Sequence, residues 1–139
     1  MSETDDVIDV LQSAYMEELE TVINYRTNSI VLDGVRAQEI KESLEEDILK
    51  QLGARPPGSA EFAAKQESLQ PPADSTDVLA VIQGVLDAEE GAIATYRRLV
   101  DLARAANDPV TEDLAVEVLA DEEAHRTEFR GFETEYRRD

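Results

Sequence analysis

Apolar residues recur every three or four positions through most of this 139-residue chain, which is the spacing of amphipathic helices. Aromatic and β-branched residues are too few and too irregularly placed to indicate strands. The sequence therefore predicts an all-α fold. Four stretches carry the helical spacing, at about 5–32, 35–52, 76–106 and 109–136.

Turn-forming residues mark two short connections between the predicted helices. Asp33-Gly34 ends the first helix, and Asp108 with Pro109 suits the cap and first position of the last helix. Short connections force consecutive helices to lie antiparallel. We therefore expect two antiparallel hairpins.

A longer connection, at about 53–75, separates the two hairpins and holds four of the five prolines. Pro56 stops the second helix early, so we expect that helix to be shortened. Asp74 or Ser75 suits the cap of the third helix. A connection of this length can cross from one end of a bundle to the other, so residues 1–139 are expected to form one four-helix domain.

The composition excludes several classes of function. There is no cysteine, so any metal must be held by oxygen and nitrogen. The formal net charge of −19 disfavours nucleic acid and anionic membranes as partners. No apolar run is long enough to span a membrane, and the acidic N-terminus is unlike a secretory signal, so we expect a cytoplasmic protein. Its few lysines suit a halophilic surface, although the charge could equally serve to attract cations.

Ionisable residues interrupt the apolar stripes of the last two predicted helices. Glu89 lies in the middle of the third stripe, and Glu122 and His125 lie in the middle of the fourth. Burying a lone carboxylate costs several kcal/mol or more, so a cation or hydrogen-bond partner is expected beside each. The stripes read Val78, Ile82, Val85, Glu89, Ala92, Tyr96, Leu99, Ala103 and Leu114, Val118, Glu122, His125, Phe129, Phe132, Tyr136.

The first predicted helix repeats part of this pattern. Tyr25 follows Glu18 by seven residues, as Tyr96 follows Glu89. Two helical turns separate the members of each pair, so each glutamate and its tyrosine share a face. The first stripe contains Leu11, Tyr15, Leu19, Val22 and Ile30.

The repeat is incomplete in the first half of the chain. Glu122 lies 33 residues after Glu89 (122 − 89), and the same step from the glutamate of the first helix ends at Gln51. Ala54 stands where the second half has His125. The first hairpin has thus lost its Glu-x-x-His, by substitution or by deletion.

At these residues the chain resembles the ferritin-like superfamily of di-iron carboxylate proteins, such as bacterioferritin and rubrerythrin. Leu119-Ala-Asp-Glu-Glu-Ala-His125 is similar to their Asp-Glu-Glu-x-His segment, and the stretch from Glu18 to Tyr25 resembles their first-helix ligand and its tyrosine. The resemblance implies metal ligands at Glu18, Glu89, Glu122 and His125, and Tyr25 and Tyr96 as residues that orient carboxylates. Glu46 or Asp47, about one turn before Gln51, or a carboxylate of a second subunit, could substitute for a missing ligand.

The same resemblance implies a function in iron handling or protection from oxidative stress. Ferrous iron and oxygen or peroxide would be the reactants of a ferroxidase-type oxidation, at a mononuclear or incomplete di-iron site. No haem is expected, because Leu52 stands where bacterioferritin has its haem-binding methionine. A homo-oligomer is expected, with a dimer favoured over a shell, because the short fifth helix of closed shells is missing.

Two other functions remain open from sequence. Loss of the ligands at Gln51 and Ala54 would also fit a degenerate scaffold that acts as a structural or interaction protein without catalysis. A DNA-protecting relative is disfavoured by the charge. Four glutamates beside the proposed ligands are expected to face solvent, because adjacent helical residues point about 100° apart: Glu17, Glu20, Glu90 and Glu123.

Overall fold

The computed structural model describes residues 2–31, 52–54, 60 and 63–138. These residues form three helices and no strand, which confirms the all-α prediction. None of the three is long and apolar enough to cross a membrane. The predicted second helix, with its early end, falls almost wholly outside the described residues. The helices are α1 (Glu3–Val31), α3 (Val78–Ala105) and α4 (Pro109–Arg137).

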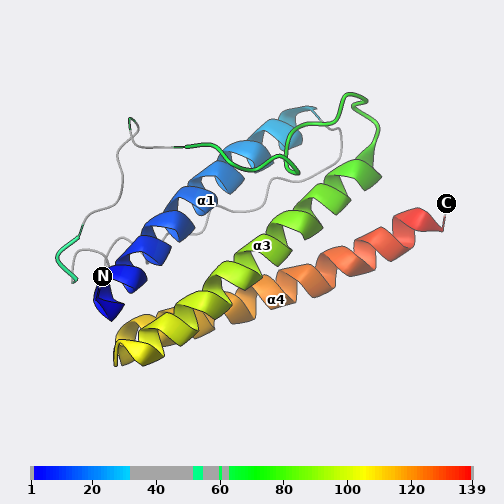
Figure 1. Ribbon diagram of the computed structural model, residues 1–139. Helices are drawn as coiled ribbons and strands as arrows, with labels where there is room; N and C mark the ends of the chain where they lie inside the picture. The colour runs from blue at the N-terminus through cyan, green and yellow to red at the C-terminus, as the bar shows by residue number, and fades with distance from the viewer. Residues whose placement is uncertain (1, 32–51, 55–59, 61–62, 139) are drawn as a thin grey trace.

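The α3–α4 hairpin closes as the sequence predicts. The Asp108 carboxylate caps α4 by accepting a hydrogen bond from the Thr111 backbone N–H at 3.1 Å, and Pro109 follows at the start of the helix. Asn107, with φ of 53°, takes the left-handed conformation that reverses the chain. The two helices therefore run antiparallel along each other (Figure 1).

The N-terminal cap of α3 differs from the prediction. Asp77 caps the helix, with its carboxylate accepting from the Ala80 N–H at 3.0 Å. The Asp74 carboxylate instead accepts from the backbone N–H and the hydroxyl of Thr76, which makes a local turn before the helix. The prediction of Asp74 or Ser75 as cap was wrong, because all four residues from 74 to 77 have side chains that can cap a helix, and only geometry separates them.

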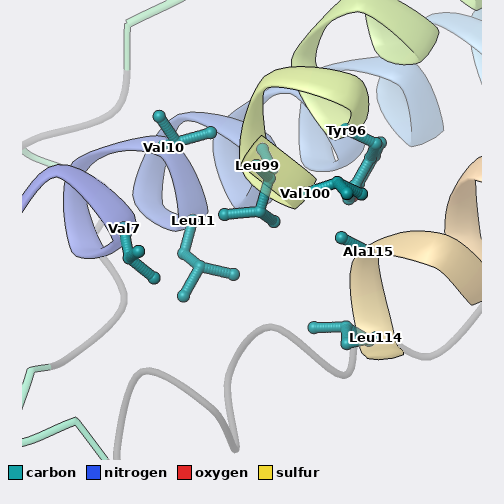
Figure 2. Close-up of a cluster of buried hydrophobic side chains, with 9 residues drawn as sticks. Val7, Val10, Leu11, Tyr96, Leu99, Val100, Leu114 and Ala115 are labelled. Atoms are coloured by element: carbon teal, nitrogen blue, oxygen red, sulfur yellow. The ribbon is translucent and has the colours of Figure 1, made fainter. Parts of the chain in front are cut away.

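One hydrophobic cluster joins all three helices near the N-terminus of α1 (Figure 2). We call it the distal cluster. Burying each of its larger side chains contributes about 1.5–3 kcal/mol. It consists of Val7, Val10, Leu11, Ala14, Tyr96, Leu99, Val100, Leu114 and Ala115.

The predicted stripes match the structure best on α3, where Val85, Glu89 and Leu99 are all buried. On α1 the stripe is partly wrong, because Leu19 is 39% exposed. On α4 the end of the stripe is also wrong, since Phe132 and Tyr136 are exposed. Periodicity assigns residues to one face of a helix, but it does not say how far neighbouring segments cover that face.

Residues 65–70, which we call the strap, lie across α1 and α3 on the way into the second hairpin (Figure 1). Leu69 is 1% exposed and packs with Val81 and Val85, and Phe129 of α4 packs against the same cluster. We call this group the strap cluster. Gly84 allows the approach, because a Cβ there would lie 2.1 Å from the Ser68 carbonyl oxygen.

Polar side chains of α1 hold the other edge of the strap. The buried Glu20 carboxylate accepts from the backbone N–H groups of Lys65 and Gln66 at 2.6–3.1 Å. The Gln66 side chain donates to the Thr21 hydroxyl at 2.7 Å and accepts from the Asn24 amide at 3.3 Å. The expectation that Glu20 faces solvent was wrong, because the strap covers the side of α1 that its own periodicity marks as polar.

Glu17 is also partly buried, against the expectation of a solvated side chain. Its carboxylate accepts a hydrogen bond from the Thr95 hydroxyl of α3 at 3.2 Å. Burial raises the pKa of Glu17 above its ordinary value of 4.5, although the Thr95 hydrogen bond and the charge of Lys65 act in the opposite direction. Glu90, by contrast, is exposed as expected.

A glycine substitution tests the contact between the strap and α3. Gly84→Ala should destabilise the protein by about 1–3 kcal/mol, because the strap backbone must move away from the new methyl group. Gly91→Ala on the same helix meets nothing within 4 Å, and should stabilise by up to about 1 kcal/mol through the better helix propensity of alanine. Urea unfolding measures both, and equal effects would contradict the close approach.

The raised pKa of Glu17 predicts a pH-dependent effect. Because the folded protein binds this proton more tightly than the unfolded chain, the ionised form lowers stability above the folded pKa, and the penalty is gone below about pH 4.5. Glu17→Gln should therefore raise the melting temperature at pH 7, with the difference vanishing in acid. Thermal unfolding across pH measures this, and Glu117→Gln at an exposed position should show no such trend.

Candidate metal centre

Three ionisable side chains converge between α3 and α4. Glu89 comes from α3, and Glu122 and His125 come from α4, where their spacing of three residues puts them on one face. One ligand atom from each lies within 4.8 Å of the others. His125 Nδ1 is 3.8 Å from Glu89 Oε1 and 3.9 Å from Glu122 Oε2.

The three side chains differ in their access to solvent. The Glu89 side chain is 4% exposed, that of Glu122 is 17% exposed and that of His125 is 25% exposed. The group thus has a buried end on α3 and a solvent-accessible end on α4. An ion held here would be partly dehydrated while still reachable from the His125 side.

The donor types, and the two distances that involve His125, fit a transition-metal ion. Two donors on one ion, each at about 2.1 Å, cannot lie more than about 4.2 Å apart, and both contacts of the histidine satisfy this limit. Carboxylate oxygens and an imidazole nitrogen suit iron, zinc and manganese. Two carboxylates brought together away from water repel each other, and a cation between them would relieve that repulsion.

Tyr96 contacts the carboxylate of Glu18 on α1. Its buried hydroxyl donates to Glu18 Oε1 at 2.5 Å, a short hydrogen bond of the kind that a charged acceptor makes. Glu18 is partly buried and lies outside the compact group of Glu89, Glu122 and His125. Three of the four proposed ligands therefore lie together, and the fourth, Glu18, is hydrogen-bonded to Tyr96.

The other candidate residues contribute little to the described geometry. Ala54 packs against the distal cluster and offers no ligand atom. Glu46 and Gln51 lie outside the described residues, as does the side chain of Tyr25, whose backbone belongs to α1. Their proposed roles stay predictions.

Glu89, Glu122 and His125, which we call the metal group, form a polar layer between two apolar regions of the α3–α4 pair. On one side lies the distal cluster, which includes Tyr96 two turns along α3 from Glu89. On the other side lies the strap cluster, which includes Val85 one turn before Glu89. The apolar neighbours lower the local polarity and so strengthen the attraction between these carboxylates and a cation.

The sequence model of the ferritin-like domain matches residues 47–138, which is 92 of the 139 residues. The chain belongs to the ferritin-like family. The matched region contains α3 and α4, and with them all three residues of the metal group.

A solved structure supports the fold of this ferritin-like chain along nearly its whole length. It is described as "Crystal structure of ferritin like, diiron-carboxylate proteins from Bacillus anthracis str. Ames". The superposition has a TM-score of 0.77 and covers 96% of this chain and 99% of the other, at 19% sequence identity. It confirms the predicted ferritin-like fold. No curated protein sequence matches the chain.

Sequence reasoning missed the contacts that α1 makes beside Glu18. The adjacent residues Glu17 and Glu18 bond to the adjacent residues Thr95 and Tyr96, so the two helices meet pairwise. The sequence carried a signal for these contacts, because Thr95 directly precedes Tyr96 just as Glu17 directly precedes Glu18. The contact of Glu20 carried no such signal, because its hydrogen-bond donors are backbone N–H groups of the strap and not side chains.

The hydrogen bond between Tyr96 and Glu18 can be tested in this ferritin-like protein without metal. Tyr96→Phe should lower the free energy of unfolding by about 1.5–3 kcal/mol, because it removes a donor from a partly buried carboxylate. Urea unfolding in the presence of a chelator is the measurement. Tyr136→Phe changes an exposed tyrosine and should be nearly neutral, so similar losses in both variants would refute the assignment.

Proposed function

We propose that this ferritin-like protein binds ferrous iron at Glu89, Glu122 and His125 and oxidises it with oxygen or peroxide. The observation that carries the proposal is the convergence of the three ligand atoms within 4.8 Å in a partly buried layer. Membership of the ferritin-like family supports iron as the metal. The physiological role would be iron handling or protection from oxidative stress.

The residues of the group have separate tasks in this proposal. Glu89 and Glu122 in their ionised form supply the negative charge that attracts the ferrous ion and favours the more highly charged ferric product. His125 supplies a neutral nitrogen donor on the solvent-accessible side, where iron and oxidant would enter. The buried position of Glu89 limits water around the substrate ion.

The proposed site is mononuclear or an incomplete di-iron site. Glu18 is one candidate for a further ligand, because the hydrogen bond from Tyr96 of α3 holds its carboxylate beside that helix. Glu46 is another candidate. Tyr96, and Tyr25 on the first helix, would orient carboxylates around the iron.

The setting proposed for this activity follows from composition and family. The −19 charge fits a cytoplasmic, single-domain protein that attracts cations, and its scarcity of lysine fits a halophilic host. A homo-oligomer, with a dimer favoured, is proposed as the working assembly. Neither nucleic acid nor membrane is proposed as a partner.

A second candidate function is a ferritin-like scaffold without turnover. It is favoured by Ala54, which offers no donor and packs instead against the distal cluster, and by Gln51. In that case the metal group would be a remnant, and ferrous iron would not stabilise the fold.

Iron binding separates the two functions. Anaerobic titration should show about one ferrous ion per chain, and iron at 100 times Kd should stabilise the fold by about 2.7 kcal/mol. Glu122→Ala should weaken binding by at least the roughly 10- to 100-fold that loss of a supporting residue alone costs. Oxygen consumption on adding ferrous iron should fall in the same variant.

Glu123→Ala is the matched control for this experiment. It removes the neighbouring carboxylate, which pairs with Arg97 at 2.9 Å on the outer face. Binding and oxygen consumption should remain as in the wild type. Absence of iron binding in the wild type, or equal losses in both variants, would reject the proposed site and favour the scaffold.

A further inference from the structure

Arg126 lies beside the metal group on α4. It directly follows His125 and is one turn beyond Glu122, so the Cβ atoms of Glu122 and Arg126 lie about 5–6 Å apart. Its guanidinium reaches α3, where Nη1 is 3.3 Å from both carboxylate oxygens of Glu90, the residue after Glu89. Each member of this ion pair is therefore the next residue in the chain after a proposed ligand.

Arg126 is buried more deeply than the other paired arginines of these two helices. Its side chain is 20% exposed, whereas the side chains of the others are 56–63% exposed: Arg97, Arg104, Arg130 and Arg137. Its Nε atom is buried and has no hydrogen-bond partner among the described residues. Because an arginine keeps its charge in a protein, a positive charge is held at the α3–α4 interface with incomplete pairing.

The ion pair with Glu90 does not cancel this charge. The Glu90 side chain is 49% exposed, and it also pairs with Arg130, whose Nη2 is 3.1 Å from the same oxygen. One carboxylate between two arginines leaves one positive charge in excess. Partly buried charges are screened by salt much less than exposed ones. A cation bound in the metal group would therefore experience repulsion from Arg126.

The repulsion depends on the charge of the bound ion. Two ionised carboxylates balance the charge of a ferrous ion. Oxidation removes one electron, which passes to the oxygen or peroxide, and leaves the ferric product with one positive charge in excess. Because the Coulomb energy is proportional to ionic charge, a fixed cation repels the ferric ion half as strongly again as the ferrous ion. Arg126 thus opposes the preference of Glu89 and Glu122 for the more highly charged ion.

We propose that Arg126 makes the centre give up its oxidised product, so that the metal group oxidises iron in repeated turnovers and does not retain it. Without this charge the two carboxylates would hold both ions more tightly, and the ferric ion most of all. The inference rests on the proposed function, because it requires iron at Glu89, Glu122 and His125.

Removal of the charge should tighten metal binding, whereas damage to the site would weaken it. Arg126→Gln should lower the Kd of cobalt(II), a redox-stable probe with visible absorption, by about tenfold. It should lower the Kd of gallium(III), a redox-inert substitute for ferric iron, by about thirtyfold, because the change in log Kd scales with ionic charge. Competition with a chelator measures both constants in the wild type and the variant.

The reduction potential of bound iron gives an independent readout. The ferric ion gains about threefold more affinity than the ferrous ion in Arg126→Gln, so the potential should fall by about 30 mV, at about 59 mV per tenfold for one electron. Anaerobic redox titration of the iron-loaded protein measures the shift. An arginine that only joined α3 to α4 would leave the potential unchanged.

Three further variants separate charge from structure. Arg126→Lys keeps the charge and should bring both Kd values back towards those of the wild type. Arg126→Met removes the charge without leaving an unpaired donor, and it should tighten binding in the same way if Arg126→Gln does not fold. Arg130→Gln removes the exposed arginine that shares Glu90, and should change Kd by no more than about a factor of two.

The outcomes separate this inference from the function on which it rests. Unchanged or weaker binding in both neutral variants, with cobalt bound normally by the wild type, would overturn the role of Arg126 and leave the metal site standing. Equal tightening in Arg130→Gln would also overturn it, because the effect would then belong to the general surface charge. Equal gains for cobalt and gallium would overturn the bias against the ferric ion. Failure of the wild type to bind cobalt or iron would overturn the site, and the role of Arg126 with it.

Discussion

The burial of Glu89 beside Glu122 and His125 is the constraint on which the rest of this structure depends. Antiparallel packing of α3 on α4 puts these groups at one level of the core, where the removal of two carboxylates from water opposes folding. Hydrophobic packing on both sides offsets the cost of burying these polar residues. A polar layer held in place by flanking hydrophobic packing is the arrangement that a metal site requires.

The predictable part of the structure is the part that local periodicity determines. Glu122 and His125 share a face because three residues nearly complete a turn, and the Asp108 cap places α4 beside α3. The buried position of Glu89 followed from the same reasoning. Predicting these features requires only the sequence of one helix, or of two helices joined by a short turn.

The unpredicted part depends on contacts between distant segments. Glu20 is buried because backbone 45 residues away donates to it, and nothing in its helix marks it as buried. Leu19, placed on the predicted apolar stripe, is exposed because its helix is covered on another side. Glycine is likewise required at position 84 only because the backbone of Ser68 packs against it. The residue pattern of a single helix does not show which residues are buried in this way, because their burial depends on the path of the strap.

The outer faces of α3 and α4 carry ion pairs at the same level as the metal group. Arg97 pairs with Glu123, and Glu90 pairs with Arg126 and Arg130. Exposed pairs of this kind contribute at most about 1 kcal/mol each, so they cannot be what fixes the register of the two helices. The buried layers fix it, and the ion pairs follow from it. The register that aligns Glu89 with His125 is therefore set by apolar packing, with Leu69 of the strap as a part of that packing.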